Sequence, residues 1–123
     1  MSIDAMRRAR AHRADTFAWL LQALKLPRHD VYLVDIGANV GAFTLAAAAA
    51  GYSVIAVEAM AMNQHALRAS LCANPGLAER VTLIPSAVGR DATRCALHSL
   101  VGNVLDGTVR CGDADAETVA DPA

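Results

Sequence analysis

The sequence predicts an α/β protein built on an open parallel sheet with flanking helices. Apolar, β-favouring runs recur three times along the chain, at Val31–Val34, Ser53–Val57 and Val81–Ile84. Helix-forming segments separate them, and turn or acidic residues follow each run. Alternation of strands and helices implies parallel strands joined by right-handed crossovers, so we expect an open doubly wound sheet.

The composition limits the size and the class of the protein. A chain of 123 residues is one domain at most, and its 54% hydrophobic residues are enough to form a buried core. Aromatic residues make up only 4%, and the net charge is −1, so nothing global favours nucleic-acid or membrane binding. Basic residues concentrate before residue 29 and acidic residues after residue 105, which is typical of a solvated basic helix and an acidic tail.

The N-terminal segment comprises residues 1–30. Within it, the sequence predicts a helix from about Asp4 to Leu26. Pro27 ends it, because proline cannot continue a helix. Its apolar stretch is too short to span a bilayer, and no secretory signal stands out, so we expect a cytoplasmic protein. Four apolar residues share one helical face: Phe17, Leu20, Leu21 and Leu24.

Two further helices are expected between the strands. The first follows Gly41 and closes at Gly51, a normal helix stop. The second runs from about Met62 to Ala73 and stops at Asn74-Pro75-Gly76. Its predicted inner face consists of Ala66, Leu67, Ser70 and Leu71.

The pattern weakens after Arg90. Short strands are indicated at Cys95–Leu100 and Val109–Cys111, and residues 108–123 are assigned to an acidic, irregular tail. The three cysteines have no C-x-x-C spacing, which favours buried or inert thiols over a zinc site or a disulfide framework. The four histidines are scattered, so no metal site is expected.

The candidate site lies where the strands end. Ligands on open α/β sheets bind at the carboxyl ends of the strands, where Asp35, Glu58 and Ser86–Ala87 all fall. Gly37 and Gly41 would leave room for a ligand close to the backbone. The sequence distance from Gly37 to Glu58 places this carboxylate at the tip of the neighbouring strand. There it could accept hydrogen bonds from ribose hydroxyls.

The glycine turn favours one nucleoside cofactor over another. A dinucleotide site has the pattern G-x-G-x-x-G, but the turn here is Gly37-Ala38-Asn39-Val40-Gly41, with asparagine at the middle glycine position. The pyrophosphate needs that glycine for close approach. S-adenosylmethionine has no phosphate, and its methionine end carries an ammonium group that suits Asp35, so it is favoured over NAD.

Four blocks in order carry a family resemblance: V-D-I-G-A-N-V-G-A-F-T-L, V-I-A-V-E, the segment from Asn63 to Asn74, and Ser86-Ala87-Val88-Gly89. Together they resemble the FkbM-type methyltransferases, class I enzymes that use S-adenosylmethionine and act mostly on oxygen. The resemblance spans about Val31 to Gly89, with weaker similarity to about Gly107. It implies a partial class I, Rossmann-like methyltransferase fold over residues 31–107, with a small-molecule or glycan hydroxyl as the methyl acceptor.

The resemblance also implies a role for each matched position. Asp35, Gly37, Ala38, Asn39 and Gly41 would line the pocket for the amino-acid end of the cofactor. Glu58 would hold the ribose, Ala59 and Met60 would flank the adenine, and the Ser86–Ala87 backbone would meet its edge. The catalytic residues remain unassigned.

Each position also has a structural reading. Gly37 and Gly41 could serve only a tight turn, and Asp35 could merely cap the following helix. Asn63 is expected to fix the loop at a helix start, and Met60 is more often a core residue than a ligand contact.

Two departures from the family pattern limit the reading. Ala59 stands where the family usually has proline, and no I-D-V-E-G-like motif follows, so the C-terminal half of the fold is expected to be missing. One alternative is therefore a non-catalytic module that pairs with a partner, or with itself, through the exposed strand Val31–Asp35. Another is a fragment of an NAD-binding oxidoreductase.

Overall fold

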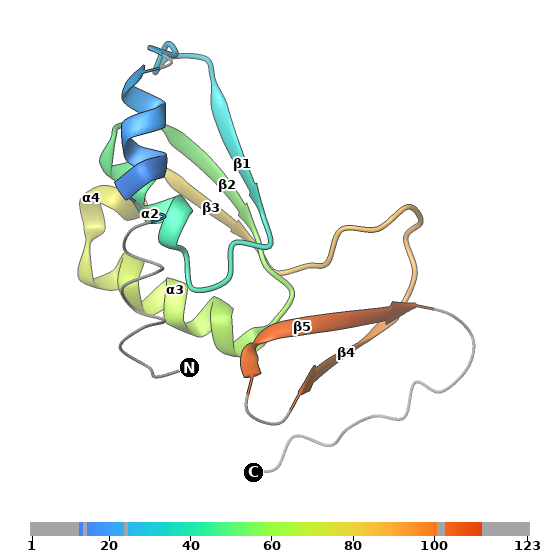
Figure 1. Ribbon diagram of the computed structural model, residues 1–123. Helices are drawn as coiled ribbons and strands as arrows, with labels where there is room; N and C mark the ends of the chain where they lie inside the picture. Colours follow the sequence, from blue (N-terminus) through green and yellow to red (C-terminus); the bar gives the residue numbers. More distant parts are fainter. Residues whose placement is uncertain (1–12, 14, 24, 101–102, 112–123) are drawn as a thin grey trace. The chain divides into compact units, whose positions relative to one another are not determined.

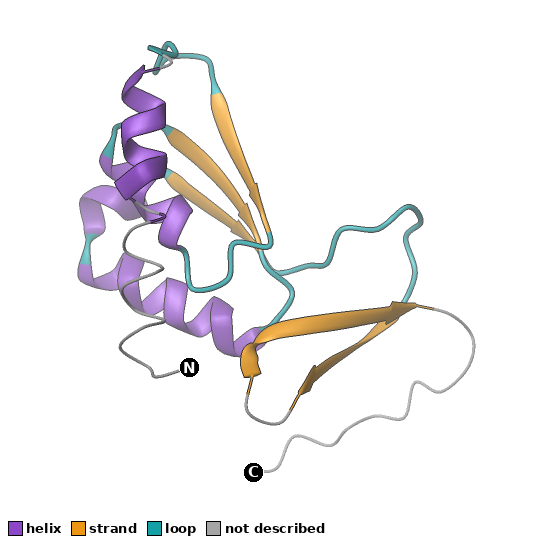
Figure 2. Cartoon of the chain, in the orientation of Figure 1, coloured by secondary structure: helices purple, strands orange, loops and turns teal. Residues whose placement is uncertain are grey.

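The computed structural model describes residues 13, 15–23, 25–100 and 103–111 (Figure 1). The chain divides into two compact units, Met1–Val88 and Gly89–Ala123, and each is described here by itself. The first unit contains the parallel sheet and the helices, and the second contains an antiparallel hairpin (Figure 2). The sequence-based assignment of residues 31–107 to one half-domain therefore runs across the boundary at residue 88.

The sheet of the first unit has three parallel strands in the order β1-β2-β3. The strands are Tyr32–Ile36, Ser53–Val57 and Val81–Ile84, in close agreement with the sequence-based expectation. Leu33 lies beside Val54, which in turn lies beside Val81. The α/β class and the parallel sheet are thus confirmed, and β1 and β3 are the two edges of the sheet.

Three labelled helices connect these strands. Helix α2 spans Ala42–Ala49, and α3 spans Ala61–Ala73. The short helix α4, Pro75–Ala78, begins at the proline that was expected only to stop α3, because proline is well suited to the first turn of a new helix. Residues 15–23 form a further helix, while the predicted start near Asp4 and Leu24, which was predicted to share the apolar helix face, lie outside the described residues.

All the described helices of this unit pack on one face of the sheet, which corrects the expectation of a doubly wound arrangement (Figure 1). The cause is topological. Two right-handed crossovers that proceed in the same direction, β1 to β2 to β3, place their helices on the same side. Helices cover both faces only where the strand order reverses, and the described order contains no reversal.

The opposite face of the sheet carries a row of exposed apolar side chains. Tyr32 and Ile36 on β1 are each 63% exposed, Val34 between them is 57% exposed, and Ile84 on β3 lies on the same face. No described helix of this unit packs against these residues. The exposed apolar surface is therefore larger than the single edge strand anticipated from the sequence.

The helix-covered face contains two clusters of buried side chains. One joins the helix at residues 15–23 to α2 and β2, and consists of Leu21, Ala47, Ala48, Tyr52 and Val54. The other joins the loop after β1 to α3, and consists of Ala38, Ala56, Leu67 and Leu71. Small alanines on α2 let this helix lie close to the sheet, as its composition predicts.

Two predicted helix faces are only partly right. In the helix at residues 15–23, Leu21 is buried but Leu20 is exposed, because the buried stripe follows Phe17 and Leu21 at a spacing of four residues. The Tyr52 hydroxyl donates to the Leu26 carbonyl at 3.1 Å and so fixes the end of this segment. In α3 the buried stripe is Asn63, Leu67 and Leu71, whereas Ala66 is exposed and Ser70 is half-buried.

The second unit is an antiparallel hairpin of β4, Cys95–Leu100, and β5, Asn103–Cys111. Strand β5 is longer than predicted, so the expected irregular tail from residue 108 is wrong as far as Cys111, and residues 112–123 lie outside the described residues. Cys95 and Cys111 lie opposite each other and form a disulfide, which corrects the expectation of free thiols. The spacing of the two cysteines in the sequence did not predict this disulfide, because strand register rather than a local motif brings them together. Cys72 is a free, exposed thiol on α3.

Candidate functional site

The loops that follow the three parallel strands meet at the carboxyl ends of these strands. The Gly37 and Ala38 amides both donate to the Val57 carbonyl, at 2.8 and 3.0 Å, which ties the loop after β1 to the end of β2. The Glu58 amide donates to the Ile84 carbonyl at 3.2 Å and ties the same point to the end of β3. The structure therefore brings the loop after β1 together with Glu58 after β2, and Ser86 and Ala87 follow shortly after β3.

Glu58 is the central polar group at the carboxyl ends of the strands. Its side chain is only 6% exposed, yet its carboxylate is well supplied with donors. Oε2 accepts from the Asn39 amide at 2.7 Å, and Oε1 accepts from the Met60 amide at 2.8 Å and the Asn63 Nδ2 at 3.4 Å. A carboxylate has about four acceptor positions, and these three bonds leave capacity for a further hydroxyl donor.

Residues of α3 fix the position of Glu58 and its loop. The Gln64 side chain donates from Nε2 to the Glu58 carbonyl at 2.8 Å and to the Ala59 carbonyl at 3.2 Å. Asn63 is 1% exposed and also approaches Met60 Sδ from Nδ2 at 3.7 Å. Asn63 thus has the loop-fixing contact expected of it, whereas Gln64 was missed, because a side chain that binds backbone carbonyls leaves no pattern in the sequence.

The loop Gly37–Gly41 uses its own amide groups internally. The first two amides bond to Val57 as described, the Asn39 amide bonds to Glu58, and the Val40 amide bonds to the Asn39 Oδ1 at 2.8 Å. The Gly41 amide completes the set by donating to the Ala38 carbonyl at 2.8 Å. All five donors are therefore occupied within the protein, whereas a phosphate-binding loop directs such amides at its ligand.

The two loop glycines serve different purposes. Gly37 has φ +76° and Gly41 has φ +90°, both in the left-handed region that favours glycine. A Cβ at Gly37 would meet no atom within 4 Å, so the space in front of this residue is open. A Cβ at Gly41 would collide with the side chain of Leu67, so that space is taken by core packing. The room for a ligand predicted from both glycines is present at Gly37 only.

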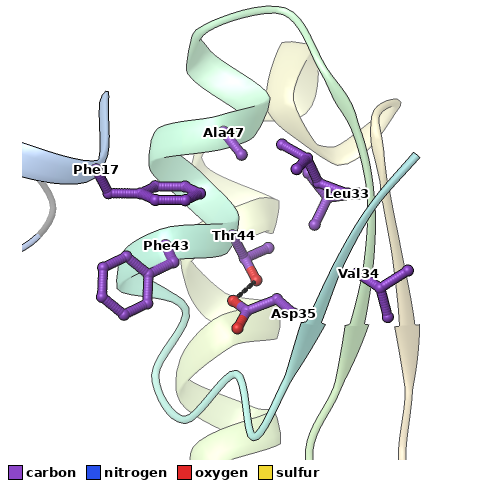
Figure 3. Close-up of a pocket in the computed structure, with 8 residues that line it drawn as sticks. Phe17, Leu33, Val34, Asp35, Phe43, Thr44 and Ala47 are labelled. Atoms are coloured by element: carbon purple, nitrogen blue, oxygen red, sulfur yellow. Dashed lines mark hydrogen bonds between the residues drawn. The ribbon is translucent and has the colours of Figure 1, made fainter. Parts of the chain in front are cut away.

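Asp35 points toward α2 (Figure 3). Its Oδ2 accepts a hydrogen bond of 2.6 Å from the hydroxyl of Thr44, a fully buried residue on that helix. This bond holds α2 against β1, although no side chain caps the helix at Gly41. Thr44 was not singled out from the sequence, because its contact with Asp35 depends on how the intervening loop turns.

An open, mostly apolar cavity of about 230 Å³ adjoins Asp35 at the edge of the sheet. Phe17 and Phe43 form one side, with their rings packed edge to face at 5.0 Å between centroids (Figure 3). Leu33, Ala47 and Val54 line the floor between β1, β2 and α2. This cavity is separate from the Glu58 hydrogen bonds, so the two acidic residues grouped by the sequence analysis lie in different surroundings.

The remaining predicted residues differ in exposure. Met60 is buried and its amide is bonded to Glu58, as a core residue would be, while Ala59 is half-buried. Ser86 and Ala87 are exposed, and the Ser86 hydroxyl donates to the Ala87 carbonyl at 3.1 Å.

Comparison with models of known protein families, with curated proteins and with solved structures gives no match for this chain. Within the described residues, no cluster of three or more histidine, cysteine or acidic side chains could hold a metal ion. None of the helices in that part of the chain is long and apolar enough to cross a membrane.

Proposed function

We propose that residues 31–89 bind S-adenosylmethionine as the cofactor-binding part of a class I methyltransferase of the FkbM type. The observation that carries the proposal is the placement of Glu58. A buried carboxylate at the end of β2 is fixed by the Asn39 amide from the neighbouring loop and retains acceptor capacity for a ribose hydroxyl. The open space at Gly37 lies in that same neighbouring loop.

The amide bonding of the glycine loop favours a cofactor without a pyrophosphate. A dinucleotide would have to compete with Val57, Glu58 and the loop itself for the five amides between Gly37 and Gly41. S-adenosylmethionine makes no such demand. Methyl transfer to a hydroxyl, the reaction implied by the resemblance, depends largely on holding the two reactants in line.

Calorimetric titration of the folded chain with S-adenosylmethionine, S-adenosylhomocysteine and NAD tests the proposal. We expect binding of the first two, and about 10–100-fold weaker binding by Glu58→Gln, since hydrogen bonds to a charged group are worth about 1.5–3 kcal/mol. Glu79→Gln is the matched control, because Glu79 is exposed and lies between α4 and the amino end of β3, whereas the candidate site lies at the carboxyl ends of the strands. The proposal would be overturned by a folded sample that binds NAD but binds neither S-adenosylmethionine nor S-adenosylhomocysteine.

The exposed row on β1 supports a second candidate, a non-catalytic module that associates through its sheet edge. Tyr32, Val34 and Ile36 lie along an edge strand that carries no lysine or proline to block pairing. In that case we expect a stable dimer in sedimentation experiments, and a monomer for Val34→Lys. His65→Lys adds the same charge on the exposed side of α3 and should leave the dimer intact. A wild-type monomer at all concentrations would exclude this candidate.

A further inference from the structure

Among the hairpin residues whose burial is described, side-chain packing is sparse. Burial is described for residues 95–99 and 107–111, and within these ranges every residue is exposed except Ala96, which is half-buried. Leu97 lies opposite Val109 on the same face as the disulfide, and both side chains are more than a third exposed. A two-stranded hairpin without a buried face is marginally stable at best in water.

The disulfide lies where it has the greatest effect on such a hairpin. Cys95 pairs with Cys111 at one end of the ladder, and the pair Leu100 and Asn103 lies at the other end. The bond closes a loop whose ends are 16 residues apart, a length for which the lost chain entropy raises the folded-to-unfolded ratio about 100-fold. Both cysteines are exposed, so a reductant can reach the bond.

We propose that the β4–β5 hairpin is a redox-controlled element, folded when Cys95 and Cys111 are joined and unfolded when they are reduced. The reductant is a dithiol. One of its thiolates attacks a cysteine sulfur, which breaks the protein disulfide and forms a mixed disulfide, and its second thiolate then releases the protein. Two electrons and two protons pass to the protein, which gains two thiols, while the dithiol becomes a disulfide.

We expect the parallel sheet to stay folded through this transition. It belongs to the other compact unit and has its own buried clusters, and neither disulfide cysteine contributes to them. The proposal therefore expects the reduction of the disulfide to unfold the hairpin and to leave the sheet folded. The inference requires no property of the cofactor site.

Amide hydrogen exchange on the full-length chain, oxidised and then reduced with dithiothreitol, tests the proposal. A Cys72→Ser background prevents disulfide exchange with the third cysteine. We expect protection of residues 96–99 and 108–110 to fall about 100-fold on reduction, while protection of Tyr32–Ile36 and Ser53–Val57 stays unchanged. Hairpin protection that survives reduction would overturn the proposal, as would a mass spectrum in which Cys95 and Cys111 remain thiols after oxidation.

A double variant, Cys95→Ser with Cys111→Ser, provides the matched control. It should have the low hairpin protection of the reduced protein under both conditions, and it should not respond to dithiothreitol. Cys72→Ser alone should respond as the wild-type chain does. A double variant with a fully protected hairpin would mean that cross-strand hydrogen bonds suffice, and would refute the redox dependence.

Discussion

The two units of this chain are stabilised by different means. In the first, three parallel strands bury one face beneath helices, and side chains such as Leu67 are completely removed from solvent. In the second, the described side chains stay largely exposed, and a covalent bond joins the open end of the hairpin. The comparison shows that regular strand pairing alone says little about stability, because the source of the free energy lies in burial in one unit and in a crosslink in the other.

The sharpest way to break this comparison is to shorten one leucine in each unit. Leu67→Ala removes a fully buried side chain at the centre of the α3 contact and should cost about 2–5 kcal/mol of unfolding free energy. Leu97→Ala removes a side chain that is 37% exposed, and the change should stay within about 0.5 kcal/mol. Urea unfolding followed by circular dichroism measures both. Equal losses for the two variants would show that the hairpin is packed as tightly as the sheet.

The loop glycines offer the next largest effect, within the first unit. Gly41→Ala combines a positive φ with a collision against Leu67, so we expect a loss of about 2–4 kcal/mol. Gly37→Ala carries only the backbone cost of about 1–2 kcal/mol, because its Cβ would meet open space. The same denaturation experiment separates them.

The affinity for S-adenosylmethionine should rank the two glycine variants differently from their stability. Gly37→Ala places a methyl group in the space assigned to the ligand, so it should weaken S-adenosylmethionine binding while the protein stays folded. A Gly37→Ala protein with unchanged affinity would argue that the open space is not used by the cofactor. Measurement at a temperature where both variants are folded removes the effect of stability.

The sequence predicted the strands well, because their apolar runs are short, separated by turn residues and rich in β-branched side chains. It also located the loop at Gly37 and the acid at Glu58, since both positions depend on local geometry at a strand end. It failed where contacts depend on register or on the path of a loop. The Cys95–Cys111 bond follows from strand pairing over 16 residues. The one-sided helix layer follows from strand order, which periodicity does not reveal.

The smallest expected effect concerns Asp35, which the sequence assigned to the cofactor and the structure binds to α2. Thr44→Val keeps the shape of a buried side chain but removes the hydroxyl that donates to the Asp35 carboxylate. Asp35 is half-buried, so water can replace part of the lost bond, and we expect a cost of about 1–2 kcal/mol. Calorimetric scanning of the variant beside the wild-type chain measures it.

Asp35→Asn then separates the structural role of this residue from a binding role. If Asp35 only anchors α2, the variant should lose less stability than Thr44→Val, because the asparagine Oδ1 still accepts from the Thr44 hydroxyl, and it should bind S-adenosylmethionine as the wild-type chain does. If the carboxylate also holds the ammonium group of the cofactor, affinity should fall by at least about 10-fold in Asp35→Asn and stay unchanged in Thr44→Val, since charge-assisted hydrogen bonds are worth about 1.5–3 kcal/mol. A parallel fall in both variants would instead place the effect in the position of α2, because Asp35→Asn weakens and Thr44→Val removes the same bond between β1 and α2.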